Sequence, residues 1–329
     1  MGINTGPQVK MKKIKNESIF STYYMNKELN DRYNTRKKDA IDVIIPVLNT
    51  NELWEANLHS FYREIPINRL IIGDGGCNDS TIEIAKKFPR CEIVTMHGTS
   101  LGYRIKKLIE NVETVFFSYL HSDVYLPNNW FDNVYKYRNK FEWFETNRIN
   151  TVMFQYLAGD ENNFKRALSG SQFGNTEFMK KISSKIEDDY SYRQEDIIFS
   201  ELVKEAGGLY HRINDTFHYH QIMNKIGAEV PEYGDIKLTV NRKDDLEFEL
   251  MMFETQVKGF IKYLNPDKKY VVESANIALY HLNKLGGLQW KEFSLWVKET
   301  NPVWLKHLKR RGSFKLRITS LAEYIYRKL

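Results

Sequence analysis

Between residues 41 and 120, short apolar runs alternate with amphipathic segments. The run that begins at Ile41 is β-branched and apolar on both faces, which is typical of a buried strand in a parallel sheet, and Pro46 is expected to end it. Further strands are predicted at 69–72, 92–96 and 114–120. Polar or glycine-rich residues follow most of these runs, as expected where a strand gives way to a loop.

The segments between these strands have the apolar spacing of helices. One helix follows the first strand, and another begins at Ser80, where Ser80 and Glu83 form the pattern of a capping box. A third helix carries apolar residues at helical spacing from Leu101 to Val112. This alternation of strand and helix predicts an α/β fold with a mainly parallel, mixed sheet flanked by helices.

Beyond residue 125 the pattern is mixed, and it becomes helical toward the end of the chain. A helix rich in Trp, Tyr and Phe is expected at 129–145, followed by a strand at 151–157, a loop at 167–175, helices at 176–187 and 194–206, and a hairpin over 209–220. From about residue 240 the apolar spacing is that of helices. The predicted organisation is a basic arm at 1–40 with a short helix near 23–29, an α/β domain at 41–222, and a helical region at 223–329.

Composition narrows the classes of protein that fit. The chain has 329 residues, 42% hydrophobic and 27% charged, which is enough apolar material for a sizeable core and excludes wholesale disorder. No run of about 18 apolar residues predicts a spanning helix, and the N-terminus lacks the apolar stretch of a signal peptide. Two cysteines make no disulfide framework, so a reducing, cytoplasmic setting is expected.

The formal charge of +6 is unevenly distributed. Residues 1–40 contain nine Lys or Arg and four Asp or Glu, residues 302–329 contain eight and one, and the remainder carries a net −6. This acidic body disfavours nucleic-acid binding, for which no recognition motif occurs. In the tail, one helical face would carry Phe314, Ile318, Leu321 and Ile325. This basic amphipathic segment is expected either to lie on an anionic membrane or to dock on the domain or at a subunit interface.

Polar residues collect where the predicted strands end. Asn49, Asp74 and Asp123 follow the first, second and fourth strands. Because the carboxyl ends of parallel strands meet at one edge of a sheet, where ligands bind, these residues are expected to share a site. Asp74 opens the turn DGGCNDST, whose glycines allow close approach of a ligand, and its carboxylate can accept a hydrogen bond from a heterocycle N–H. The alternative is a strand-to-helix turn that needs glycine for its geometry.

Two further groups could carry metal-binding or acid–base chemistry. Asp123, in the sequence HSD, can bind Mg²⁺ or Mn²⁺ when a diphosphate supplies the remaining oxygens, or it can simply form a turn. His218 and His220 point to one face of a predicted strand, as metal ligands or as structural residues. Glu195 and Asp196 open a helix, where the helix dipole favours them, and a carboxylate held there can also act as a general base.

In chain order, these segments resemble the inverting family 2 glycosyltransferases with the GT-A fold. IDVIIPVLN resembles the entry strand of that family, IIGDGGCNDST its nucleotide-binding turn, HSD its DxD motif, and RQED its general-base motif; the resemblance covers residues 41–222. Cys77 replaces the usual Ser of the turn, and His121 replaces the first Asp of DxD. The Q/R-x-x-R-W signature of processive members is absent, so processive synthesis is not expected.

The resemblance implies a role for each segment. Residues expected to bind the nucleotide are Pro46, Val47, Asn49, Asp74, Arg104, His121 and Ser122. Asp123 would hold a divalent cation, Mn²⁺ or Mg²⁺, together with His218 or His220. Asp196, beside Glu195, would deprotonate the acceptor hydroxyl. The implied reaction is non-processive, inverting transfer from a nucleotide sugar, with a UDP-sugar favoured, in glycan or glycolipid assembly.

The sequence indicates less about the acceptor than about the donor. A saccharide or lipid-linked acceptor is expected, and Phe173 and Phe178 would either stack on its sugar or pack under the sheet. A cytoplasmic location follows, with possible peripheral membrane contact and a possible homo-oligomer. Two other functions stay open: a sugar-nucleotide nucleotidyltransferase, which normally has a Gly-rich loop where this chain has PVLN, and a non-catalytic carbohydrate- or membrane-binding scaffold.

Overall fold

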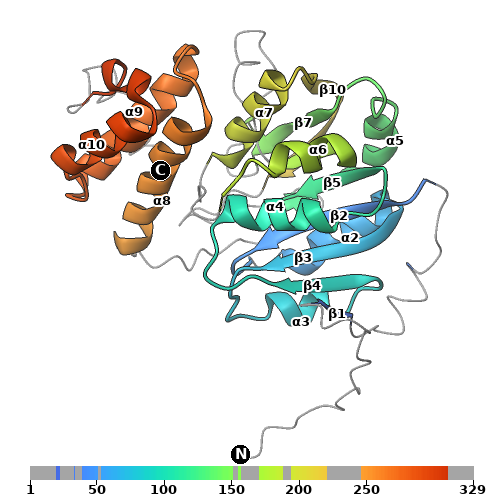
Figure 1. Cartoon of the computed structure of the whole chain (residues 1–329). Helices are drawn as coiled ribbons and strands as arrows, with labels where there is room; N and C mark the ends of the chain where they lie inside the picture. The colour runs from blue at the N-terminus through green and yellow to red at the C-terminus, as the bar shows by residue number, and fades with distance from the viewer. Residues whose placement is uncertain are drawn as a thin grey trace, which may run out of the picture.

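The computed structural model describes residues 20–22, 33, 39–50, 53–150, 155–156, 170–187, 194–220 and 246–309. Its centre is one ten-stranded sheet (Figure 1). The strands are β1 (Phe20–Thr22), β2 (Ile41–Val47), β3 (Ile67–Asp74), β4 (Cys91–Thr95), β5 (Phe116–Leu120), β6 (Val124–Tyr125), β7 (Trp143–Asn150), β8 (Gln155–Tyr156), β9 (Ser171–Asn175) and β10 (Tyr210–His220). Their order is β1-β4-β3-β2-β5-β9-β7-β10-β6, and β8 pairs with β7. The expected mixed α/β fold is confirmed.

The direction of the strands decides what meets at each edge of the sheet. Strands β4, β3, β2 and β5 are mutually parallel, so their carboxyl ends lie together. Strand β9 is antiparallel to β5, and its first residue, Ser171, pairs with Leu120 at the end of β5. Strand β10 is parallel to β7 and ends at His220, where it pairs with β6. The edge at which β2, β3 and β5 end is therefore also reached by the start of β9.

Helices cover both faces of the sheet (Figure 1). They are α2 (Trp54–Glu64), α3 (Thr81–Ala85), α4 (Leu101–Asn111), α5 (Trp130–Tyr135), α6 (Thr176–Ser183), α7 (Glu195–Glu205), α8 (Leu246–Tyr263), α9 (Lys269–Lys284) and α10 (Trp290–Thr300), followed by the 3₁₀ turn η2 (Pro302–Lys306). Helices α2, α3 and α5 pack on one face, and α4, α6 and α7 pack on the other. Alternate residues of β2 supply both cores: Val43 and Ile45 belong to the first, and Ile44 to the second.

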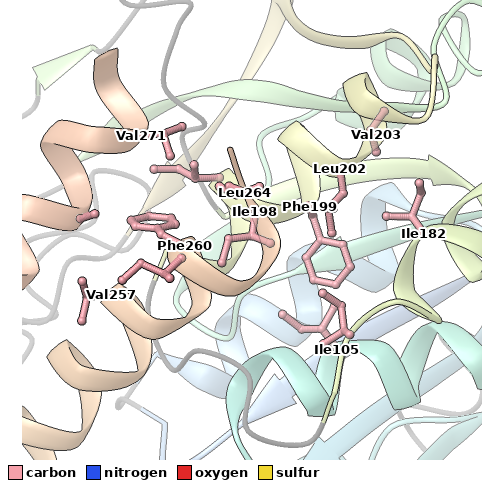
Figure 2. Close-up of a cluster of buried hydrophobic side chains, with 14 of the residues drawn as sticks. Ile105, Ile182, Ile198, Phe199, Leu202, Val203, Val257, Phe260, Leu264 and Val271 are labelled. Carbon is pink, nitrogen blue, oxygen red and sulfur yellow. The ribbon is translucent and has the colours of Figure 1, made fainter. Parts of the chain in front are cut away.

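The C-terminal helices α8, α9 and α10 do not have a core of their own within the described residues. Their buried side chains belong to the same cluster as those of α4, α6 and α7. Figure 2 shows Ile198 of α7 beside Phe260 of α8. The Trp304 side chain is fully buried, and its Nε1 donates to the carbonyl oxygen of Leu264 at 2.8 Å. The helical region therefore buttresses the helix that begins at Glu195.

A buried ionic cluster holds the opposite edge of the sheet, where β2 and β3 begin. Asp42 is fully buried, and its carboxylate accepts hydrogen bonds from Arg69 Nη2 at 2.7 Å and from Asn68 Nδ2 at 2.8 Å. It also accepts from the backbone N–H of Glu113 at 2.8 Å. The cluster ties β2 and β3 to the residues just before β5.

Two expectations for the first strands and turns are wrong. Pro46 does not end the first strand, because β2 continues to Val47. Pairing between β2 and β5 stops at Ile44, so no hydrogen bond between these strands is lost because Pro46 lacks an N–H. The Ser80 side chain makes no capping bond; the Asp79 carboxylate accepts from the N–H of Thr81 at 3.0 Å instead.

Three expectations for the middle of the chain are also wrong, each because a central strand is polar or aromatic. The helix expected at 129–145 ends at Tyr135, and Trp143 opens β7, where its buried ring packs against those of Phe117 and Tyr119 on one face of the sheet. The loop expected at 167–175 contains β9, in which a Cβ on Gly174 would lie 2.5 Å from the Trp143 ring. The hairpin expected at 209–220 is the single strand β10, whose irregularity after Ile213 resembles a turn in the sequence.

Some expectations lie outside the described residues. These are the short helix near 23–29, most of the strand at 151–157, and the amphipathic tail beyond residue 309. Among the helices that the structure describes, none combines the length and apolar character needed to cross a bilayer.

Candidate active site

The turn after β3 is built around the Asp74 carboxylate. Its Oδ1 accepts hydrogen bonds from the backbone N–H of Gly76 at 2.9 Å and of Cys77 at 2.8 Å. Its Oδ2 lies 3.0 Å from Nε2 of His97, a side chain that is 59% exposed. Burial raises the pKa of Asp74, but the hydrogen bonds from Cys77, His97 and Gly76 outweigh it and lower the pKa below its ordinary value. Asp74 is therefore a carboxylate, and its Oδ2 is in contact with an exposed imidazole.

The loop after β2 is joined to the same turn. Asn49 has a positive φ of 51° and exchanges two hydrogen bonds with Asn78: its Nδ2 donates to Asn78 Oδ1 at 2.8 Å, and its Oδ1 accepts from the backbone N–H of Asn78 at 3.0 Å. The N–H of Thr50 donates to Thr81 Oγ1 at 2.9 Å. Asn49 is thus joined by hydrogen bonds to the turn that Asp74 opens, and the exposed polar surface there is formed by Asn49 and Asn78, since the Asp74 side chain is buried.

Three residues expected to bind the nucleotide are buried beneath this polar surface. Pro46 and Val47 are buried in β2, and the carbonyl oxygen of Val47 accepts from the N–H of Gly75 at 2.9 Å. Arg104 is only 3% exposed, and its Nη1 donates to that same carbonyl at 2.9 Å. A Cβ on Gly75 would lie 1.7 Å from this Nη1. The expected phosphate contact of Arg104 is therefore wrong: the side chain supports the turn from beneath.

His121, Asp123 and His220 form a compact group at the end of β5. Each offers one ligand atom, and these atoms all lie within 4.8 Å of one another. Asp123 Oδ2 lies 3.3 Å from His220 Nε2, and Asp123 Oδ1 lies 4.0 Å from His121 Nδ1. Burial and the positive charges of Arg148 and His121 lower the pKa of His220 well below its ordinary value. His220 is thus a neutral imidazole, which is the form that binds metal ions.

The backbone fixes the position of this group. The N–H of His121 donates to the carbonyl oxygen of Gly170 at 2.9 Å, just before β9 begins. The carbonyl oxygen of Ser122 accepts from Asn57 Nδ2 of α2 at 2.8 Å. The backbone of Ser122 is thus held by α2, and the contact of its side chain with a nucleotide stays a prediction.

His218 does not join this group. Its side chain is fully buried, and its Nδ1 lies 2.8 Å from Thr146 Oγ1 and 2.9 Å from Ser171 Oγ. Its ring centroid lies 6.0 Å from that of His220, so the two rings share a face as the alternation predicts. Of His218 and His220, only His220 lies beside Asp123 among the described residues. His121, which was expected to bind the nucleotide, also lies in this group.

The predicted general-base pair opens α7 beside the histidine group. Glu195 and Asp196 are both buried, with 4% and 6% of their surfaces exposed. Glu195 Oε1 accepts from the Tyr119 hydroxyl at 3.2 Å and lies 3.5 Å from His121 Nε2. Glu195 is thereby committed to Tyr119 and His121, which leaves Asp196 as the carboxyl able to exchange a proton with a ligand.

Asp196 has the electrostatic surroundings of a proton acceptor. Burial, together with the negative charges of Glu195 and Glu145, raises the pKa of Asp196 to about 8, and His121 opposes the shift. A carboxyl with a pKa near physiological pH can take a proton and release it again, as general-base catalysis requires.

One positively charged side chain near the middle of the sheet, that of Arg148, was not among the predicted site residues. Arg148 lies on β7, in register with His218 of β10. Burial lowers the pKa of Arg148, while the negative charges of Asp196, Glu145 and Asp123 oppose this shift. Its Nε is buried and has no hydrogen-bond partner among the described residues. The signal in the sequence was a charged and polar strand, WFETNRIN, in the middle of the sheet.

The two aromatic residues expected at the acceptor do not reach this edge. Phe173 is 1% exposed, and its ring stacks on that of Phe116 at a centroid distance of 5.9 Å, so it is a core residue. Phe178 follows the end of β9, which pairs with the start of β5 at Phe116. Phe178 is partly buried against the core and lies near the opposite end of β5 from His121. For both residues the packing supports the alternative of a structural role, and an acceptor contact stays a prediction.

The comparisons with known proteins give structural similarity alone. No protein-family model and no curated protein sequence matches the chain. Solved structures similar to it include TarS from S. aureus, at 14% identity and a TM-score of 0.47 over 82% of this chain; the chain spans 48% of that TarS structure. TarS in complex with UDP-GlcNAc matches at 13% identity and a TM-score of 0.46, covering 82% of this chain and 79% of the other.

A further similar structure is the mannosyltransferase PcManGT from Pyrobaculum calidifontis in complex with GDP-Man and Mn²⁺. It matches at 11% identity and a TM-score of 0.47, covering 90% of this chain and 85% of the other.

Proposed function

We propose that the chain is a metal-dependent, inverting, non-processive glycosyltransferase that transfers a sugar from a nucleotide-sugar donor to an acceptor hydroxyl. The observation that carries this proposal is the juxtaposition at one sheet edge of a buried carboxyl, Asp196, and a potential metal-binding group, His121, Asp123 and His220. The exposed Asp74 turn lies at the end of the neighbouring strands β2 and β3. Ligand recognition, charge stabilisation and proton transfer are thus available at one edge.

The Asp74 turn is the proposed site for the nucleoside. We expect a heterocycle N–H to replace His97 at Asp74 Oδ2, because that imidazole is exposed and free to move aside. The ring N–H of either uracil or guanine fits this acceptor, and we propose a UDP-sugar as the favoured donor. Asn49 and Asn78 form the rim of the turn.

The residues of the histidine group fit a divalent cation. Two imidazole nitrogens and one carboxylate oxygen converge from β5 and β10, and the remaining positions would be open to diphosphate oxygens. When bound, such a cation neutralises negative charge on the leaving diphosphate, which is the Lewis-acid role of metal catalysis.

Asp196 is the proposed general base. It accepts the proton of the acceptor hydroxyl while the acceptor oxygen forms a bond to the anomeric carbon, on the face opposite the diphosphate. The bond between that carbon and the diphosphate oxygen breaks, and its electron pair remains on the diphosphate. The configuration at the anomeric carbon is inverted because attack and departure occur on opposite faces. Glu195 holds His121 and Tyr119 in place and takes no proton in this step.

Analysis of the products tests this function. The chain incubated with a nucleotide sugar is expected to release a nucleoside diphosphate, detected by ³¹P NMR. Release of pyrophosphate from a nucleoside triphosphate and a sugar phosphate would instead identify a nucleotidyltransferase. A protein that binds sugars but turns over neither kind of substrate would be a scaffold.

We expect Arg148→Gln to weaken binding of a nucleoside diphosphate by about 10- to 100-fold, because a charge-assisted hydrogen bond to a phosphate would be lost. Arg148→Lys keeps the charge but not the planar fork, and an intermediate loss is expected. Calorimetric titration with UDP and GDP measures both. The control is Arg138→Gln, because the guanidinium of Arg138 lies over the ring of Tyr135 in α5 and not in the candidate site. Unchanged affinity in Arg148→Gln would remove this residue from the site.

The raised pKa of Asp196 predicts a pH profile. Only the ionised carboxylate accepts a proton, so kcat/KM is expected to rise about tenfold per pH unit and to level off near pH 8. The same shift makes the folded state bind a proton that the unfolded state has lost, so the free energy of unfolding falls as pH rises from 3.8 toward 8. Asp196→Asn should abolish both slopes. Steady-state rates and chemical denaturation over this range test them, and a flat kcat/KM below pH 7 in the wild type would be inconsistent with Asp196 as the base.

A further inference from the structure

The junction between helices α8 and α9 contacts the chain on both sides of Asp196. This α8–α9 junction, residues 262–270, comprises the end of α8, the connection and the start of α9. Its side chains reach Glu187, which precedes Asp196 in the chain, and Glu201, which follows it in α7. The proposed general base therefore lies between two points at which the C-terminal helices hold the chain.

The contact before Asp196 is made at a single peptide group, the one between Ile186 and Glu187. The N–H of Glu187 donates to the hydroxyl oxygen of Tyr263 at 2.9 Å, and the carbonyl oxygen of Ile186 accepts from Lys106 Nζ of α4 at 2.6 Å. The Ile186 side chain is itself buried, with 1% of its surface exposed. Both polar atoms of this peptide group are thus bonded, one to α8 and one to α4.

The contact after Asp196 is made at a buried carboxylate. Glu201 of α7 is 2% exposed, and its Oε1 accepts from Lys204 Nζ of the same helix at 2.6 Å and from the Tyr270 hydroxyl. Its Oε2 accepts from Lys268 Nζ. Burial raises the pKa of Glu201, but the hydrogen bonds from these three donors outweigh it and lower the pKa below its ordinary value. Glu201 is therefore ionised, and it joins α7 to the start of α9.

The α8–α9 junction is itself held in place by the residues after α10. The carbonyl oxygen of Leu264, within the junction, accepts from Nε1 of the fully buried Trp304 at 2.8 Å. One turn earlier in α8, the carbonyl oxygen of Ile261 accepts from Asn301 Nδ2 at 3.1 Å. Because buried hydrogen bonds fix the junction from behind, it can restrain the two segments that it contacts.

We propose that the α8–α9 junction is a positioning element for the general base. Its positioning residues are Tyr263, which acts on the chain before Asp196, and Lys268 and Tyr270, which act on α7 after it. Position matters for a base because a misplacement of about 1 Å can lower a rate by about 10²-fold. The catalytic part of this inference rests on the proposed function, whereas the restraint itself can be measured without substrate.

Removal of single hydroxyl groups tests the positioning. In the full-length chain, Tyr263→Phe and Tyr270→Phe are each expected to lower the single-turnover rate of nucleoside diphosphate release from the nucleotide sugar by about tenfold. Calorimetric affinity for UDP and GDP with Mn²⁺ should stay that of the wild type, because the named contacts of the junction do not include the turn at Asp74. Wild-type rates in both variants, or equal losses of rate and affinity, would overturn the proposal.

Two matched substitutions separate position from stability. Tyr62→Phe removes the same group from a buried tyrosine of α2, whose hydroxyl donates to the carbonyl oxygen of Pro89 on the opposite face of the sheet from α7. It should leave the rate unchanged, and a loss as large as that in Tyr270→Phe would contradict positioning. Lys268→Arg keeps a cation for Glu201 and should retain the rate that Lys268→Met loses; equal rates in these two variants would remove Lys268 from the proposal.

Amide hydrogen exchange without substrate measures the restraint directly. The backbone N–H groups of residues 197–203 should exchange slowly in the wild type and faster in Tyr263→Phe and Tyr270→Phe, but not in Tyr62→Phe. Fast exchange in the wild type, or unchanged exchange in both junction variants, would overturn the proposal even if a variant fails to fold or turn over.

The positioning and the proposed function also fail separately. A protein that shows this pattern of exchange but turns over no nucleotide sugar refutes the function alone. An active transferase whose rate is unchanged in Tyr263→Phe and Tyr270→Phe refutes the positioning alone.

Discussion

Asp196→Asn is expected to lower sugar transfer by at least about 10²-fold while the nucleotide-sugar donor still binds, since a positioned base contributes about 10²- to 10⁴-fold. The amide has nearly the same shape as the carboxyl but cannot accept the proton of the acceptor hydroxyl. Because Asp196 is buried at the start of α7, a neutral amide there should not disturb the fold. Single-turnover rates and calorimetric donor affinity, measured on the same preparation, separate the chemical step from binding.

Matched substitutions make this result specific. Asp132→Asn, an exposed residue of α5, should leave transfer unchanged. Glu195→Gln should slow transfer less than Asp196→Asn and weaken metal binding instead, because Glu195 contacts His121. Turnover of Asp196→Asn close to that of the wild type would refute the assignment of the base.

Asp42→Ala is expected to destabilise the fold by about 3–5 kcal/mol, the usual cost of removing one partner of a buried ion pair. The Asp42 carboxylate is fully buried and accepts hydrogen bonds from Arg69, from Asn68 and from the backbone of Glu113. Its removal takes a buried acceptor from all three donors, although Arg69 still donates to the carbonyl oxygen of Asn111. Denaturant unfolding monitored by fluorescence measures the loss.

The control for this prediction is a second carboxylate on the same arginine. Glu113 Oε1 lies 3.3 Å from Arg69 Nη1, but its side chain is 75% exposed. Water screens such a pair, so Glu113→Ala should change stability by no more than about 1 kcal/mol. Equal losses in Asp42→Ala and Glu113→Ala would show that burial does not decide the energetics of this cluster.

The first half of the sheet could be predicted because its strands are mostly apolar and alternate with amphipathic helices. The second half could not, because its central strands break that pattern. Strand β7 carries Glu145 inside the protein, where it pairs with Arg212 of β10 through a hydrogen bond of 2.9 Å, and it carries Arg148 at a half-buried position. In sequence, such residues are typical of a surface, and only the pairing of distant strands makes them buried.

The candidate site shows the same division. Asp74, Asp123 and Asp196 could be predicted because each stands at the end of a strand or the start of a helix, which local sequence reveals. The choice between His218 and His220 depended on the register of β10 against β6 and β7, over a strand that is irregular after Ile213. Arg148 was missed for the same reason, since its proximity to Asp196 arises only from the folded sheet.

The central claim is that one edge of the sheet binds the diphosphate of a nucleotide sugar with the help of a divalent cation. Calorimetric titration of the full-length chain with UDP, GDP and dTDP, with Mn²⁺ and then with a chelator, tests it most directly. We expect at least one nucleoside diphosphate to bind with Mn²⁺, with binding lost in the chelator and in Asp123→Ala. Absence of binding for all three, or binding unaffected by the chelator and by Asp123→Ala, would contradict the account.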